Sequence, residues 1–193
     1  MQLLGDRADL ALARLPVLGR RFAAAPVPVG LTETPTGHAI VVGYGRVGRA
    51  VTAGLRAAGL PVLVIEEDLH LIHELTAAGI PAIYGDASYR RIMDAAGAGR
   101  ARLILVALPD AGATRVVVLN ARRVNPDAPI LARVARGEHD AAIRRAGATT
   151  TVAPERAGAV LLLEESAHAL GLPVDAVLGM APAGVERGRP PQR

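Results

Sequence analysis

The stretch HAIVVGYGRVGRAV, residues 38–51, carries the strongest structural signal in the chain. Its four apolar residues, 39–42, have the length and composition of a buried strand. They run directly into Gly43-Tyr44-Gly45-Arg46-Val47-Gly48, after which a helical pattern begins. A strand, a G-x-G-x-x-G turn and a helix in this order form the context in which a βαβ unit binds nucleotide phosphates.

Each glycine of this turn has its own predicted role. Gly43 permits the tight turn, Gly45 lets the backbone approach a pyrophosphate, and Gly48 lets the helix pack against the strand. Phosphates at the helix N-terminus are favoured by about 0.3–2 kcal/mol. Arg46 opposes the helix dipole unless an anion joins it, so it also indicates an anionic ligand. The alternative is a glycine turn with a solvated Arg46 and no ligand.

Acidic residues follow the next two predicted strands. Glu66 ends the strand at 61–66, at roughly the 20-residue spacing of an acid that accepts from ribose hydroxyls. Three acids in succession, Glu66, Glu67 and Asp68, should repel a 2′-phosphate, which favours NAD(H) or AMP, ADP or ATP over NADP. Asp68 could equally cap a helix and Glu67 could be solvated. Asp86 could face an adenine or cap the helix after it.

Strand and helix patterns alternate along most of the chain. Strands are predicted at 39–42, 61–66, 80–85, 101–108, 128–134 and 149–154, and helices at 46–58, 68–78, 88–96, 110–124, 137–146 and 155–170. This alternation predicts an α/β fold, a Rossmann-type doubly wound parallel sheet of six strands in the order 3-2-1-4-5-6. We assign 1–37 to a basic amphipathic segment and linker, 38–170 to the nucleotide-binding domain, and 171–193 to a disordered tail.

The composition excludes several classes of protein. Hydrophobic residues make up 51% of the chain and aromatic residues 2%, which predicts an aliphatic core such as that of a covered parallel sheet. The basic residues are all arginine, scattered, and accompanied by few rings for base stacking, so we expect no nucleic-acid partner. No cysteine is present, and no run of about 18 apolar residues could cross a membrane. These features indicate a cytoplasmic protein.

Five segments together resemble the RCK/KTN N-terminal domain, also called Trk-N: VVGYGRVGRAV, VLVIEED, AGIPAIYGDAS, AAGAGRARLILVALPDAGAT and ILARV. The resemblance covers residues 38–170 and is strongest to the cytosolic domain of Kef-type potassium/proton antiporters. It implies a dimeric regulatory domain that binds NAD(H), AMP, ADP or ATP. The site residues it implies are Gly43, Tyr44, Gly45, Arg46, Val47 and Gly48 for phosphates, Glu66 with Glu67 for ribose, Asp86 and Ala87 beside adenine, Leu108 and Pro109 near the second half of a dinucleotide, and Arg133 as a ligand or interface residue.

The resemblance also implies a place at the inner face of the cell membrane, beside a membrane ion-transport protein or after a covalently attached membrane domain. Residues 1–37 resemble the tether that follows the last transmembrane helix of such an antiporter. No RCK C-terminal domain is expected after residue 170. The chain could therefore be a piece of a larger antiporter or a free-standing subunit.

No catalytic or metal site is expected. The chain has no lysine, and its five histidines, His38, His70, His73, His139 and His168, do not stand at the predicted strand ends where the ligand would lie. A nucleotide sensor needs only different affinities for its ligand in two conformations. The alternatives are an NAD-dependent oxidoreductase that completes its substrate site by dimerisation, and an interaction module with an empty site.

Two apolar runs predict a homodimer. Residues 116–119 and 159–163 are consecutive apolar positions in predicted helices, and such runs cover more than one helical face. One face should pack on the sheet, and the rest should form a shared interface. Burial of both helices by the N-terminal segment of the same chain is the alternative.

Overall fold

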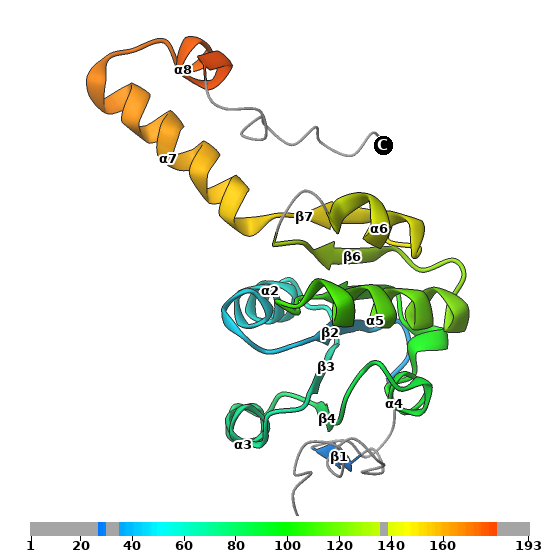
Figure 1. Ribbon diagram of the computed structural model, residues 1–193. Coiled ribbons are helices and arrows are strands. Elements are labelled where there is room, and N and C mark those ends of the chain that lie inside the picture. The colour runs from blue at the N-terminus through cyan, green and yellow to red at the C-terminus, as the bar shows by residue number, and fades with distance from the viewer. Residues whose placement is uncertain (1–26, 30–34, 136–138, 181–193) are drawn as a thin grey trace, which may run out of the picture.

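Six parallel strands form the centre of the molecule (Figure 1). The computed structural model describes residues 27–29, 35–135 and 139–180. The parallel strands lie in the order β4-β3-β2-β5-β6-β7, which confirms the predicted order 3-2-1-4-5-6. Their bounds are β2 Ala39–Val42, β3 Val62–Glu66, β4 Ala82–Tyr84, β5 Leu103–Val106, β6 Ile130–Arg133 and β7 Thr150–Val152.

A seventh strand extends the sheet at one edge. β1, Val27–Val29, pairs antiparallel with β4, and Pro28 lies opposite Ile83. The assignment of these three residues to a linker is therefore wrong. Pro28 concealed the strand, because proline lacks an N–H and is tolerated in sheets mainly at edges. The predicted amphipathic segment in residues 1–26 lies outside the described residues.

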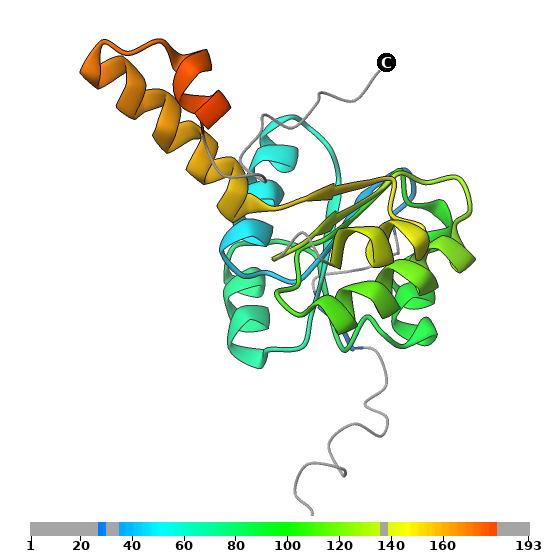
Figure 2. The same cartoon turned by 45° about the horizontal axis from the view of Figure 1, so that its top comes forward.

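Helices cover both faces of the sheet (Figure 2). α2, Arg46–Ala57, and α3, Leu69–Ala77, cover one face. α4, Arg90–Ala95, the 3-10 turn η1, Ala98–Arg100, α5, Ala111–Val124, and α6, Asp140–Arg145, cover the other. Successive strand residues point to opposite faces, so Ile40 and Val42 join the second core while Ala39 and Val41 join the first.

The last two helices project from this body (Figures 1 and 2). α7, Pro154–Leu170, ends at Gly171, whose left-handed φ of 65° terminates the helix. α8, Val174–Met180, packs against α7. The sequence predicted a disordered tail from residue 171, and this is wrong for 174–180, where a short apolar segment is helical. We call α7 and α8 together the arm.

A buried histidine lies at the amino end of β2. The side chain of His38 is fully buried, and its Nε2 lies 2.9 Å from the carbonyl oxygen of Ala96. Its Nδ1 has no hydrogen-bond partner among the described residues. Burial lowers the pKa of His38, the bond to Ala96 acts in the opposite direction, and the positive charge of Arg100 lowers the pKa further. The folded domain therefore prefers the neutral ring.

This preference predicts that acidification destabilises the fold. Because the unfolded chain takes up a proton near pH 6.5 and the folded chain only at a lower pH, the free energy of unfolding should fall as the pH drops below about 6.5. Urea unfolding of the wild type and of His38→Gln, on both sides of that pH, measures the effect. The neutral amide of the glutamine variant can still donate a hydrogen bond but does not titrate. If the free energy of unfolding of this variant falls with pH as steeply as that of the wild type, His38 is not the source of the pH dependence.

Candidate functional site

A cleft of about 1100 Å³ opens at the carboxyl ends of the parallel strands. It spans the point where the chain order reverses between β2 and β5, the usual ligand position in open α/β sheets. All the expected site residues except Tyr44 and Gly48 line it, namely Gly43, Gly45, Arg46, Val47, Glu66, Glu67, Asp86, Ala87, Leu108, Pro109 and Arg133. The fold therefore brings together residues that are distant in sequence.

The three glycines meet different surroundings. Gly43 has a left-handed φ of 90°, which a side chain would strain. A Cβ added to Gly48 would collide with the carbonyl oxygen of Gly43, so Gly48 allows α2 to pack directly on the turn. A Cβ on Gly45 would meet nothing within 4 Å, and Gly45 lines the cleft. Gly48 therefore serves packing, whereas Gly45 leaves the cleft open.

The N-terminus of α2 differs from those of α3 and α5. Asp68 caps α3 by accepting from the His70 N–H, and Asp110 caps α5 by accepting from the Ala113 N–H. α2 has Gly45 at its N-cap, with no side-chain cap and no acidic residue in its first turn. The N–H groups of this turn and the Arg46 side chain therefore offer positive charge to the cleft.

Glu66 fastens the glycine turn to the end of β3. Its Oε2 accepts a hydrogen bond from the Tyr44 N–H at 2.6 Å, and its Oε1 accepts from the N–H groups of Glu67 and Asp68 at 2.8 and 3.0 Å. The residue is only 9% exposed. A carboxylate has about four lone-pair sites, so about one remains for a ribose hydroxyl. The sequence analysis did not foresee this structural role, which makes Glu66 a poor residue for testing ligand binding alone.

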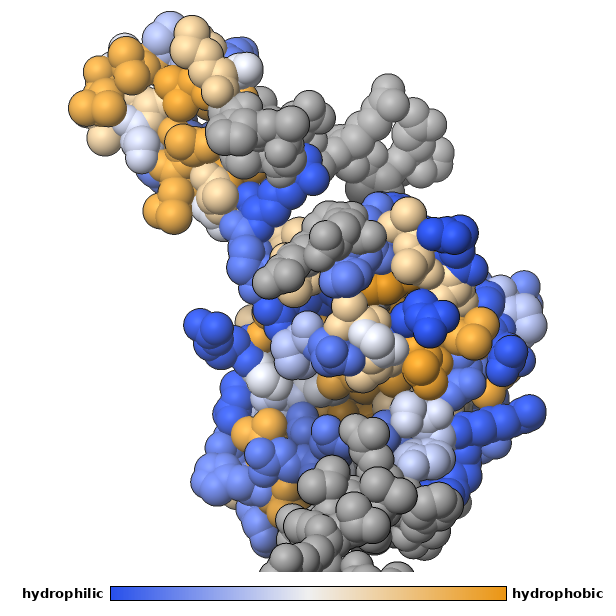
Figure 3. Space-filling view, viewed as in Figure 1, coloured by the Kyte–Doolittle hydropathy of each residue, from blue (hydrophilic) through white to orange (hydrophobic). Residues whose placement is uncertain are grey.

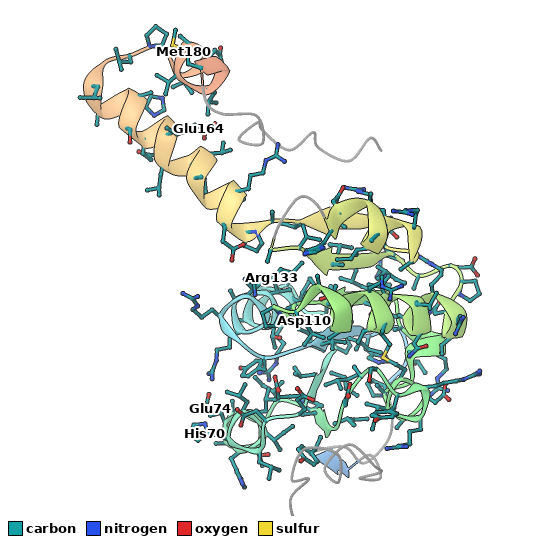
Figure 4. The ribbon with its side chains drawn as sticks, viewed as in Figure 1. His70, Glu74, Asp110, Arg133, Glu164 and Met180 are labelled. Atoms are coloured by element: carbon teal, nitrogen blue, oxygen red, sulfur yellow. The ribbon has the colours of Figure 1, made fainter. Side chains whose placement is uncertain are left out.

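Tyr44 lies behind the cleft wall. Its ring packs into the core between the sheet and α2–α3. The Arg49 guanidinium lies 4.9 Å from the ring centroid and pairs with Glu74 of α3. The side chains of Glu74 and His70, labelled in Figure 4, also pair on the outer surface of α3. Tyr44 therefore helps to join α2 to α3.

Asp86 shapes the turn after β4. Its Oδ1 accepts from the Ser88 N–H at 2.8 Å. α4 begins only at Arg90, with Tyr89 at its N-cap, so the helix starts later than expected and Asp86 is not its cap. Asp86 also lines the cleft beside Ala87, where a ligand can reach it.

The cleft contains, beside the expected Arg133, several residues that the sequence analysis missed. Arg133, labelled in Figure 4 near the base of α7, places its Nη2 2.6 Å from Oε1 of Glu155, in the first turn of α7. The missed residues share one signal that could have found them. Each follows a parallel strand by a few positions, and the carboxyl ends of parallel strands meet at one edge of the sheet. The missed polar and ring-bearing residues are Ser88, Tyr89, Asp110, Pro154 and Glu155.

Comparison with known proteins gives a consistent result. The family model described as TrkA-N domain matches residues 39–154. The putative cation/proton antiporter YbaL of Escherichia coli is 35% identical over 127 residues, which are 66% of this chain and 23% of that protein. The glutathione-regulated potassium-efflux system protein KefC of Salmonella paratyphi B is 28% identical over 133 residues, 69% of this chain and 22% of KefC. The chain thus spans less than a quarter of these relatives.

Two solved structures have the same fold. The crystal structure of the TrkA-N domain of YbaL has a TM-score of 0.66 and 34% identity, covering 68% of this chain and 98% of that domain. The Shewanella denitrificans Kef CTD, in its AMP-bound form, has a TM-score of 0.60 and 26% identity, covering 72% of this chain and 85% of the other.

The two glycines of α2 provide a matched test of the turn geometry. Gly48→Ala should lower the free energy of unfolding by about 1–3 kcal/mol or more, because its Cβ would collide with a backbone carbonyl. Gly54→Ala, in the same helix but facing open space, should raise it by about 0.4–1 kcal/mol. Urea denaturation measures both. Equal effects of the two substitutions would contradict the close contact at Gly48.

Proposed function

The chain belongs to the TrkA-N domain family, and from this premise we propose that its cleft binds an adenosine nucleotide whose phosphates rest on the first turn of α2. The uncapped N-terminus of α2, with Gly45 and Arg46 in the cleft, carries this proposal. Glu66 at the end of the adjacent strand β3 supplies an acceptor for ribose. The AMP-bound Kef CTD, with the same fold, supports it.

The charges of the cleft favour an unmodified ribose. The carboxylates of Glu66 and Glu67 line the wall at the end of β3, where a 2′-phosphate would be repelled. A volume of about 1100 Å³, extending to Leu108, Pro109 and Arg133, accommodates a second nucleotide half. We therefore expect NAD(H), AMP, ADP or ATP to bind more tightly than NADP.

We further propose that binding regulates a cation transporter instead of serving catalysis. YbaL and KefC, by their names, are cation/proton antiporter and potassium-efflux proteins, and this chain matches one part of each. No histidine is among the residues that line the cleft in the described part of the chain, and the sequence contains no lysine. A transporter at the inner face of the membrane, fused to the domain or bound to it, is the proposed partner. Within 35–135 and 139–180, every helix falls short of the length and hydrophobicity that a membrane span requires.

An oxidoreductase completed by dimerisation remains the alternative function. In that function a second chain would complete the substrate site, and the titratable groups lining the cleft in the described residues are carboxylates, arginines and Tyr89. Incubation with NADH and a panel of carbonyl compounds distinguishes the two functions. Turnover of NADH with any of them would overturn the sensor proposal.

The arm supports a homodimer. Hydrophobic residues gather on α7 and α8 in Figure 3, and Leu161, Leu162 and Met180 are 61%, 71% and 86% exposed. In α5, Val117 and Val118 of the apolar run pack in the core of the same chain, as expected for one face, while Val116 is 38% exposed. Of the two helices expected to form an interface, α7 leaves the larger exposed apolar surface.

The sheet has a complementary surface. On the face covered by α2 and α3, Leu103, Leu105 and Leu131 are only partly buried. Their strand neighbours on the opposite face, Ile104 and Ile130, are fully buried. An apolar helix from a second copy would cover the partly buried leucines, so we propose that the arms are exchanged or paired in a two-fold dimer.

Nucleotide binding predicts a thermal shift. A ligand at 100 times its Kd stabilises the folded state by about 2.7 kcal/mol, which raises the Tm of a domain of this size by about 5–10 °C. We expect such a shift with NAD, NADH, AMP, ADP or ATP, and a smaller one with NADP. Differential scanning fluorimetry with each nucleotide at millimolar concentration measures it.

Gly45→Val is the control for this measurement. The φ of Gly45 is −69°, which valine can adopt, and the added side chain stands in open space at the mouth of α2. The variant should fold like the wild type and lose the nucleotide shift. A wild type that shifts with none of the nucleotides would leave only the empty interaction module.

The dimer predicts a defined response to charge on the arm. Leu161→Glu or Leu162→Glu should weaken self-association about tenfold or more, because a charge would be buried in an apolar interface. Leu69→Glu, on a similarly exposed leucine of α3, should not. Sedimentation equilibrium of the full chain at micromolar concentration measures the association. A monomeric wild type would refute the dimer.

A further inference from the structure

The ion pair between Arg133 and Glu155 connects the cleft to the arm. Arg133 ends β6, Glu155 lies in the first turn of α7, and both line the cleft. Their Nη2–Oε1 distance is 2.6 Å. The Arg133 side chain is 19% exposed and the Glu155 side chain 58%. The pair therefore stands at the rim of the cleft, with the arginine on its inner side.

Arg133 has unused hydrogen-bonding capacity. A guanidinium has five N–H donors, and the Nε of Arg133 is buried without a hydrogen-bond partner among the residues that the structure describes. Guanidinium groups bind phosphate in two-bond arrangements. The residue is thus suited to an anionic ligand, yet the described anion beside it is the carboxylate of Glu155.

The charge of Arg46, at the end of the glycine turn, also acts on Glu155. Its pKa is lowered by its own backbone N–H, by Arg133 and by the charge of Arg46 at the start of α2. The carboxylate is therefore ionised at neutral pH, near both cations that line the cleft. A phosphate placed on the α2 turn and Glu155 would repel each other and attract the same cations.

The ion pair also holds α7 to the body. α7 packs chiefly on α8, and only Val160 and Ala167 among its residues are buried. The helix leaves the body directly after β7, as Figures 1 and 2 show. The Arg133–Glu155 ion pair links its first turn to β6, and the charge of Arg156 in the same turn acts on Asp140 of α6.

We propose that Glu155 is a built-in competitor of the ligand: its carboxylate holds the Arg133 guanidinium until a nucleotide phosphate takes its place, and this exchange releases the first turn of α7. The inference rests on the proposed nucleotide binding and adds its route of regulation. By thermodynamic linkage, a ligand that opens the pair must bind more tightly when the pair is already open. Nucleotide binding and the release of the arm thus both follow from the replacement of the Glu155 carboxylate on Arg133 by a phosphate.

The test compares the affinity of variants for ligands with and without phosphate. Isothermal titration calorimetry on the full chain measures Kd for NAD, AMP and adenosine. Glu155→Gln should bind NAD and AMP about 2- to 10-fold more tightly than the wild type, and adenosine equally. Glu164→Gln makes the same charge change further along α7, as Figure 4 shows, and should leave all three affinities unchanged.

Two further measurements test the exchange itself. In an Arg133→Gln background, the gain from Glu155→Gln should shrink, because there is no guanidinium to release; an undiminished gain would mean simple repulsion and would overturn the proposal. Hydrogen exchange at the amides of residues 157–160 should accelerate when NAD binds to the wild type. In Glu155→Gln, exchange at these amides should be fast even without ligand. If NAD leaves the exchange of the wild type unchanged and Glu155→Gln exchanges as slowly as the wild type, the proposal is also overturned.

The outcomes separate this inference from the nucleotide proposal. If the wild type binds neither NAD nor AMP, both fail. If the wild type binds them and Glu155→Gln binds equally or more weakly, nucleotide binding stands and the competitor role of Glu155 fails.

Discussion

The hydrogen bonds of the Glu66 carboxylate hold the cleft in shape. The bond from the Tyr44 N–H joins the glycine turn after β2 to the end of β3, and the bonds from the N–H groups of Glu67 and Asp68 fix the carboxylate at that strand end. The turn can then approach α2 as closely as the bare Cα of Gly48 allows. Because the turn is fixed from both sides, the N–H groups at the start of α2 face the cleft without a side-chain cap. A turn whose backbone is already fixed needs little reorganisation when a ligand binds to it.

The two ends of the cleft differ in how firmly their side chains are held. Near β3 and β4, acidic side chains belong to turns that are closed by their own backbone hydrogen bonds, as at Glu66 and Asp86. Near β6 and β7, Arg133 and Glu155 bind each other, and Glu155 belongs to a helix with few contacts to the body. Local stability follows contact density, so the second end is the more easily moved. A ligand that contacted both ends would therefore meet a rigid wall near β3 and β4 and a movable one near β6 and β7.

Much of the fold follows from the sequence pattern. Six apolar segments separated by helical periodicity specify a parallel sheet, and the handedness of βαβ crossovers then restricts the strand order. The elements that this reasoning missed are short. β1 has three residues around Pro28, and α8 has seven residues in a stretch rich in proline and glycine. Segments of this length have no measurable periodicity, and it is pairing with β4 and packing on α7 that makes them regular.

The candidate site, like the fold, has features that the sequence indicated and others that only the tertiary structure decided. The sequence by itself indicated the glycine turn and Glu66, because the motif typical of phosphate-binding βαβ units has these residue types at local spacings. Asp86 was indicated by the family resemblance. Only the tertiary structure decided that Glu66 supports the turn, that Tyr44 faces the core, and that Glu155 meets Arg133. The hydrogen bonds of Glu66 to Tyr44 and of Arg133 to Glu155 each join residues 22 positions apart in the chain. Hydrogen-bond partners across such separations depend on how strands align side by side, which no local pattern specifies.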